Sequence, residues 1–102
     1  MDNRKLIHFF GRLGKNPELK YTQKQEPICY LSIAETVPNL DGPIWHQVVV
    51  WGKQAETCSV FLKKGGSVFI RGNQIERDYK IENGELKKIK EVKAESVGIV
   101  LV

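Results

Sequence analysis

Residues 44–53 read "IWHQVVVWGK", and this stretch decides the fold. Its valine run favours a β-strand, because β-branched side chains suit a pleated surface. Side chains alternate between the two faces of a strand, so Trp45 and Trp51 share one face, with Gln47 between them. The opposite face carries His46 and valines that a core can bury. Two large rings on the first face remain to be explained.

The segments before this strand are also predicted to be β-strands. From Arg4 to Leu13 both faces are apolar, which predicts cover by a core on one side and by a partner on the other. The two faces carry Ile7, Phe9 and Leu13, and Leu6, His8 and Phe10. A short strand, "ELKYT" (18–22), follows. The segment 27–36 alternates as a further strand, and the Pro, Asn, Asp and Gly of "VPNLDGP" (37–43) predict a loop.

Downstream of Gly52 the apolar period changes from that of a strand to that of a helix. The apolar positions are Ala55, Cys58, Phe61 and Leu62. A Gly65-Gly66 stop signal follows, with Lys63 and Lys64 in the predicted last turn. We therefore expect one helix of about three turns.

Strand character resumes at "SVFIRGNQIER" (67–77), where Gly72 predicts a bulge or a close backbone approach. "NGE" (83–85) predicts a turn, and residues 86–102 alternate as a last strand. Apart from the short strand at 18–22, the order is therefore three strands, one helix and two strands. This is the layout of an OB-fold, an all-β, five-stranded Greek-key barrel with a helix between strands three and four. The length of 102 residues predicts a single domain, 1–102.

The composition is that of a globular protein, with 41% hydrophobic and 27% charged residues. The formal net charge of +4 permits an anionic partner. No apolar run approaches the roughly 18 residues of a membrane span, and the start of the chain lacks a secretion signal. We expect no membrane partner and a cytoplasmic location. Cys29 and Cys58 form no metal or redox motif and are expected to be reduced packing residues.

The sequence contains no organised catalytic group. An enzyme needs a nucleophile with a base, a carboxylate pair or a metal cluster, and the candidates here are His8, His46 and two scattered cysteines. We expect no catalytic residue, no metal and no cofactor. Aromatic and basic residues form the stronger pattern, because Trp45, Trp51 and Tyr79 lie on or beside strands rich in Lys and Arg. Unpaired bases stack on such rings while cations hold the phosphates, which favours single-stranded nucleic acid over duplex.

Four blocks of the sequence closely resemble bacterial single-stranded-DNA-binding proteins. They are "GRLGKNPELKYT" (11–22), "WHQVVVWGKQAE" (45–56), "FLKKGGSVFIRG" (61–72) and "IER" with Tyr79. Together they cover nearly the whole chain in the right order. The resemblance implies an OB-fold, a homotetramer with a dimer as the alternative, and no cofactor. It also implies sequence-tolerant binding of single-stranded DNA in replication, repair and recombination, at the nucleoid of the bacterial cytoplasm rather than in an organelle.

The resemblance also implies roles for single residues. The family's stacking positions match the two tryptophans and Tyr79, the last at the base of the long hairpin. His46 matches a histidine at a subunit contact, and Leu6 and His8 complete the predicted oligomer interface. The expected phosphate contacts are Arg12, Lys15, Lys20, Lys53, Arg71, Arg77 and Lys87.

The sequence departs from the family pattern at two places. The loop from Glu35 to Ile44 lacks a tryptophan that many members carry, so one stacking platform is expected to be missing. The sequence stops at "GIVLV" (98–102), where members usually continue into a flexible linker and an acidic tail that recruits other enzymes. Either this is a trimmed DNA-binding core or it is a tailless relative. Replication and repair proteins are therefore not assigned as partners.

Two other functions fit the pattern. A dimeric primosomal or RNA-binding OB-fold accessory protein would match the shortened aromatic set and the missing tail. A structural assembly subunit would instead bury both tryptophans at an interface. Native mass spectrometry with RNA competition separates the first alternative from the DNA-binding function. Tryptophan fluorescence that does not respond to oligo-dT would support the second.

Overall fold

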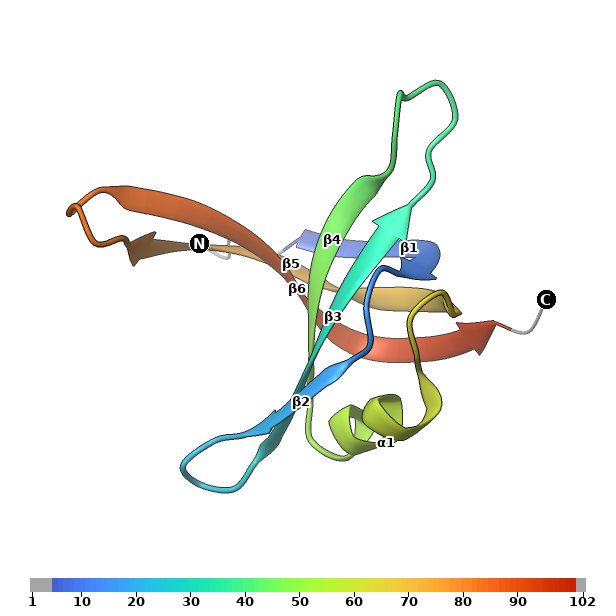
Figure 1. The fold of residues 1–102 in the computed structure, drawn as a ribbon, viewed down its shortest axis with the longest axis horizontal. Helices are drawn as coiled ribbons and strands as arrows, with labels where there is room; N and C mark the ends of the chain where they lie inside the picture. The colour runs from blue at the N-terminus through green and yellow to red at the C-terminus, as the bar shows by residue number, and fades with distance from the viewer. Residues whose placement is uncertain (1–4, 101–102) are drawn as a thin grey trace.

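The computed structural model describes residues 5–100, without the side chains of Arg77 and Tyr79. Within that range the chain forms six strands and one helix (Figure 1). The strands are β1 (Lys5–Leu13), β2 (Glu18–Tyr21), β3 (Pro27–Glu35), β4 (Ile44–Trp51), β5 (Ser67–Lys80) and β6 (Leu86–Val100), and the helix is α1 (Lys53–Phe61). Arg4 and residues 101–102, the outer ends of two predicted strands, lie outside the described residues.

The strands form one sheet that closes on itself. Their order is β1-β5-β6-β4-β3-β2, and β1 also pairs with β3, which completes the ring. Strands β4 and β6 run parallel at Val48 and Val49, opposite Val92 and Lys93, while the other pairs are antiparallel. This confirms the predicted OB-fold with one helix. The chain has six strands rather than five because "ELKYT" contributes β2, a separate strand paired with β3.

Each strand of the barrel packs its apolar face into the interior. Val48 and Val50 of β4 are each 1% exposed, as the alternation around the tryptophans predicts. Cys29 and Cys58 are buried free cysteines, which confirms their predicted packing role. The core cluster is Phe9, Leu13, Cys29, Leu31, Ile33, Val48, Val50, Ala55, Cys58, Leu62, Val68, Ile70 and Val92. The opposite face of each strand is therefore the outer surface of the barrel.

Gly72 marks the place where β5 bends around the barrel. The pairing of β5 with β6 shifts register between Arg71 and Gly72, as the predicted bulge requires. A Cβ atom at residue 72 would overlap the carbonyl oxygen of Lys93. Both features predicted for this glycine, a bulge and a close backbone approach, are confirmed. Beyond the bend, the far ends of β5 and β6 project from the barrel as a long hairpin (Figure 1).

The helix is shorter than its apolar spacing predicts. It ends at Phe61, and Leu62 is extended, with its N–H bonded to the carbonyl of Cys58. The next residues pair with the end of β1, since Leu13 donates to Gly66 and accepts from Gly65. That pairing ends the helix before the two lysines. Phe61, expected with the apolar positions of the helix, is 64% exposed. No helix in residues 5–100 is long and apolar enough to cross a membrane.

Candidate nucleic-acid interface

The two tryptophans lie on the outer face of β4, as predicted. Trp45 is 56% exposed and Trp51 is 41% exposed, while Val48 and Val50 between them point into the core. Six residues of strand separate the two rings by at most roughly 20 Å along β4. We call this outer surface of β3 and β4 the tryptophan face. It presents two separate aromatic surfaces.

Trp45 is held beside two of the predicted phosphate contacts. Its ring lies over Gly14, where a Cβ atom would overlap the ring. Arg12 pairs with Ala34, and Ala34 pairs with Trp45, so these residues form one row across three strands. Lys15 follows Gly14 in the bend after β1. Arg12 and Lys15 therefore lie at the end of the tryptophan face that carries Trp45.

Trp51 has its own group of cations. Lys20 and Trp51 both pair with Ile28, which places them in one row of the sheet. The Lys93 ammonium lies 6.0 Å from the centre of the Trp51 ring, and the Lys20 ammonium lies 5.7 Å from that of Tyr30. A hollow of about 330 Å³ opens here, lined by Tyr30, Val49, Trp51, Ile75, Glu91 and Lys93. Neither Tyr30 nor Lys93 is among the site residues predicted from sequence.

The strip between the two aromatic surfaces is polar and internally bonded. The Gln47 side-chain amide donates to the Ser32 hydroxyl at 3.1 Å, across the β3–β4 pair. This bond ties the Gln47 side chain to its neighbour on β3. A strand of nucleic acid crossing from one tryptophan to the other meets a fixed polar surface there.

Other predicted DNA contacts do not lie on the tryptophan face. Arg71 lies on the outer face of β5 next to β1. Lys53 is the first residue of α1, and Lys87 lies on the projecting hairpin. The side chains of Arg77 and Tyr79 lie outside the described residues, so their predicted roles stay predictions.

A second exposed aromatic surface lies on β1 and β5, and we call it the β1/β5 face. Its members are Leu6, His8, Phe10 and Phe69. Leu6 is 54% exposed and Phe10 is 56% exposed, and the rings of His8 and Phe69 lie 6.1 Å apart. This face contains the predicted interface residues Leu6 and His8. Its apolar side chains have two polar neighbours on β5, since Asn73 pairs with Leu6 and Arg71 pairs with His8.

His46, the third predicted interface residue, makes its contacts within the subunit. Its ring stacks on Phe9 at 3.8 Å between ring centres, and its Nε2 lies 2.9 Å from Glu35 Oε1. The His46 side chain is only 12% exposed. The structure therefore places His46 on the other side of β1 from Leu6 and His8. Its role at a subunit contact stays a prediction.

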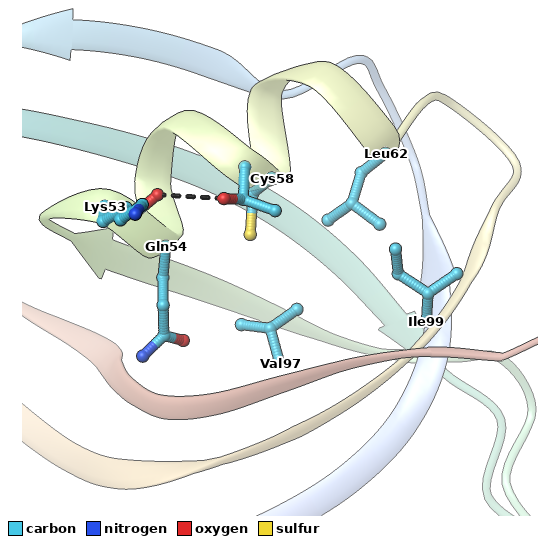
Figure 2. Close-up of a pocket in the computed structure, with 7 residues that line it drawn as sticks. Lys53, Gln54, Cys58, Leu62, Val97 and Ile99 are labelled. Atoms are coloured by element: carbon cyan, nitrogen blue, oxygen red, sulfur yellow. Dashed lines mark hydrogen bonds between the residues drawn. The ribbon is translucent and has the colours of Figure 1, made fainter.

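An apolar hollow of about 290 Å³ lies between α1 and β6, away from both exposed faces (Figure 2). Figure 2 shows the Cys58 sulfur pointing into it, toward the side chain of Val97. Burial, and then the nearby Cys29 thiol, raise the pKa of Cys58 to about 11. The Cys58 thiol is therefore protonated at neutral pH and a weak nucleophile. This hollow lacks the clustered cations of the tryptophan face.

The described part of the chain holds no group of three or more His, Cys, Asp or Glu residues placed to bind a metal ion. The features gathered on the outer surface are instead exposed rings with cations beside them. The model of the "Single-strand binding protein family" matches residues 4–100. The chain belongs to this family. Its description is one of binding, in agreement with the prediction of a non-enzymatic protein.

Relatives in this family come from several bacteria. A "Single-stranded DNA-binding protein" of Neisseria meningitidis serogroup B is 36% identical over 85 residues, which are 76% of this chain and 49% of the relative. "Single-stranded DNA-binding protein 1" of Synechocystis is 34% identical over 70 residues, which are 66% of this chain and 58% of the relative. A relative from Thermosynechococcus vestitus is 32% identical over 69 residues, which are 67% of this chain and 58% of the relative. This chain spans about half the length of these relatives.

Proposed function

We propose that this protein binds single-stranded DNA on the tryptophan face, without reading its sequence. The observation that carries the proposal is the pair of exposed rings, Trp45 and Trp51, on one face of β4 with cations beside each. Membership of the single-strand binding protein family and the names of its relatives support it.

The chemistry follows from the flat face of a base. Every base presents a π-face that can stack on an aromatic ring, for roughly 1–3 kcal/mol per base, whatever its sequence. A duplex hides those faces, so stacking selects single strands. Arg12 and Lys15 near one ring, and Lys20 and Lys93 near the other, supply positive charge for the phosphates. Sequence-tolerant binding of this kind protects single strands during replication, recombination and repair, which in bacteria take place at the nucleoid in the cytoplasm.

The same proposal includes self-assembly through the β1/β5 face. Exposed apolar side chains gathered on one surface mark an interaction site. A twofold contact buries the same patch on two copies, and two such contacts give an even-numbered assembly. We expect a homotetramer, with a dimer as the simpler outcome.

Tryptophan fluorescence tests the DNA-binding proposal. Oligo-dT is expected to quench the signal and to bind far more tightly than the matching duplex at moderate salt. The logarithm of the binding constant should fall with the logarithm of the salt concentration by roughly 0.7 for each phosphate contacted. Equal affinity for duplex and single strand would contradict the proposal. Fluorescence that does not respond to oligo-dT would favour a structural role for the tryptophans.

A further inference from the structure

The hollow beside Trp51 has an aromatic side chain on each of two neighbouring strands. Tyr30 pairs with Val49 across β3 and β4, and Trp51 lies two residues farther along β4 on the same face. Diagonal neighbours of this kind are roughly 7–8 Å apart, within reach of aromatic side chains. Both rings line the 330 Å³ hollow, with Ile75 from β5 and with Glu91 and Lys93 from β6 as further lining.

We propose that Tyr30 and Trp51 together hold one unpaired nucleobase in this hollow. The inference rests on the proposed binding of single-stranded DNA and adds to it a residue and a geometry. Val49 lies in the same cross-strand row as Tyr30 and Lys93, and all three line the hollow. The base contacts two rings rather than one, and Tyr30 becomes a DNA-binding residue.

The two lysines explain how the backbone of the nucleic acid is held at the same place. In the free protein the Lys20 ammonium lies over the Tyr30 ring and 3.1 Å from the Glu18 carboxylate, and the Lys93 ammonium lies over the Trp51 ring. Such contacts are weak at exposed sites. A base that enters the hollow displaces each ammonium from its ring. The flexible lysine stems then carry the charge to the phosphates on either side of that base.

The geometry predicts a difference in coupling that a double-mutant cycle measures. If Tyr30 and Trp51 hold the same base, Tyr30→Leu should weaken oligo-dT binding by roughly 5- to 20-fold. Once Trp51→Ala has removed the other wall, the same change should cost distinctly less, since contacting residues couple. Trp45 lies at the other end of β4, so Tyr30→Leu should cost the same in a Trp45→Ala background as in the unaltered protein.

Two control variants separate stacking from other effects. Tyr30→Phe keeps the ring and should bind like the unaltered protein. Tyr21 is an exposed tyrosine that hydrogen-bonds Glu56 of α1, away from the hollow, so Tyr21→Leu should leave DNA affinity unchanged. Melting temperatures of all variants identify any loss of folding.

The outcomes distinguish this inference from the function on which it rests. Strong binding by the unaltered protein, with losses for both tryptophan variants but none for Tyr30→Leu, would overturn the Tyr30 site alone. Additive losses for Tyr30→Leu and Trp51→Ala would overturn the shared base. Failure of the unaltered protein to bind oligo-dT would overturn both proposals.

Discussion

The tryptophan face and the β1/β5 face are both exposed and aromatic, yet they differ in what surrounds the rings. Around Trp51 the Lys93 ammonium lies over the ring and Lys20 lies in the same cross-strand row, while Glu91 also lines the hollow. On the β1/β5 face, Phe10 pairs with Phe69, while Leu6 pairs with Asn73 and His8 pairs with the cation Arg71. The two faces meet near Arg12, at the end of β1. Exposed aromatic area alone therefore does not identify a binding partner.

The different surroundings of the rings correspond to different kinds of partner, a nucleic-acid strand or a protein surface. A nucleic-acid strand presents flat bases at intervals along a charged backbone, so its partner needs separated rings with cations beside them. A protein surface buries continuous apolar area and leaves charged groups at the rim. The spacing of Trp45 and Trp51 fits the first description, while the close pairing of Phe10 with Phe69 fits the second.

The largest effect should come from a charge placed on the β1/β5 face. Leu6→Asp is expected to abolish assembly, because an unpaired carboxylate at a closed apolar contact costs roughly 3–5 kcal/mol. Leu40 provides a matched control, since it is equally exposed but lies in the loop between β3 and β4. Sedimentation should show smaller species for Leu6→Asp and no change for Leu40→Asp. A monomeric unaltered protein would refute self-assembly through this face.

Truncation of the tryptophans should give the next largest effect. Trp45→Ala and Trp51→Ala are each expected to lose roughly 1–3 kcal/mol of oligo-dT affinity. The losses should add, because the rings are too far apart to touch. Melting temperature should hardly change, since neither ring belongs to the core cluster. A loss of roughly 3–5 kcal/mol of stability, with DNA affinity unchanged, would instead mean that the rings serve packing.

Alanine variants of the two histidines compare the loss of an internal contact with the loss of an exposed side chain. His46→Ala removes the stack on Phe9 and the contact with Glu35, which should lower the free energy of unfolding by about 1–2 kcal/mol. His8→Ala should leave the unfolding energy nearly unchanged and weaken assembly. Urea denaturation and sedimentation of both variants provide the measurement. Weakened assembly with unchanged stability for His46→Ala would favour the predicted subunit contact.

The smallest effect should distinguish cations on the two faces. Log affinity falls as log salt concentration rises. Lys93→Ala should make this fall less steep by roughly 0.7, the contribution of one phosphate contact. Arg71→Ala removes a cation from β5 next to β1 and should leave the slope unchanged. Oligo-dT titrations at four salt concentrations measure both slopes. A less steep salt dependence for Arg71→Ala alone would mean that the DNA contacts the β1/β5 face.

The alternation of side chains explains what the sequence could predict. In β4 the period of two separates the tryptophans from the buried valines, and this requires no knowledge of neighbouring strands. The same rule places Tyr30 on an outer face. It does not say which ring lies next to Tyr30, because that depends on the register of β3 against β4. The tyrosine was therefore visible in the sequence, while the hollow that it lines was not.

Contacts between distant segments explain the remaining differences. Lys93 reaches Trp51 because β6 pairs in parallel with β4, a pairing that local patterns do not encode. Arg71 lies beside His8 rather than beside the tryptophans because β5 pairs with β1 at that point, and its phosphate contact stays a prediction. The helix ends early because the residues after it pair with Leu13. In each case a tertiary contact overrides a local pattern.

Photo-crosslinking of bound oligo-dT tests most directly the claim that DNA lies on the tryptophan face. Ultraviolet irradiation of the complex, followed by protease digestion and mass spectrometry, identifies the residues in contact with bases. We expect crosslinks at Trp45, at Trp51 and at Tyr30, with none on the β1/β5 face. Crosslinks concentrated at Phe10 or Phe69, with the tryptophans unmodified, would contradict this account.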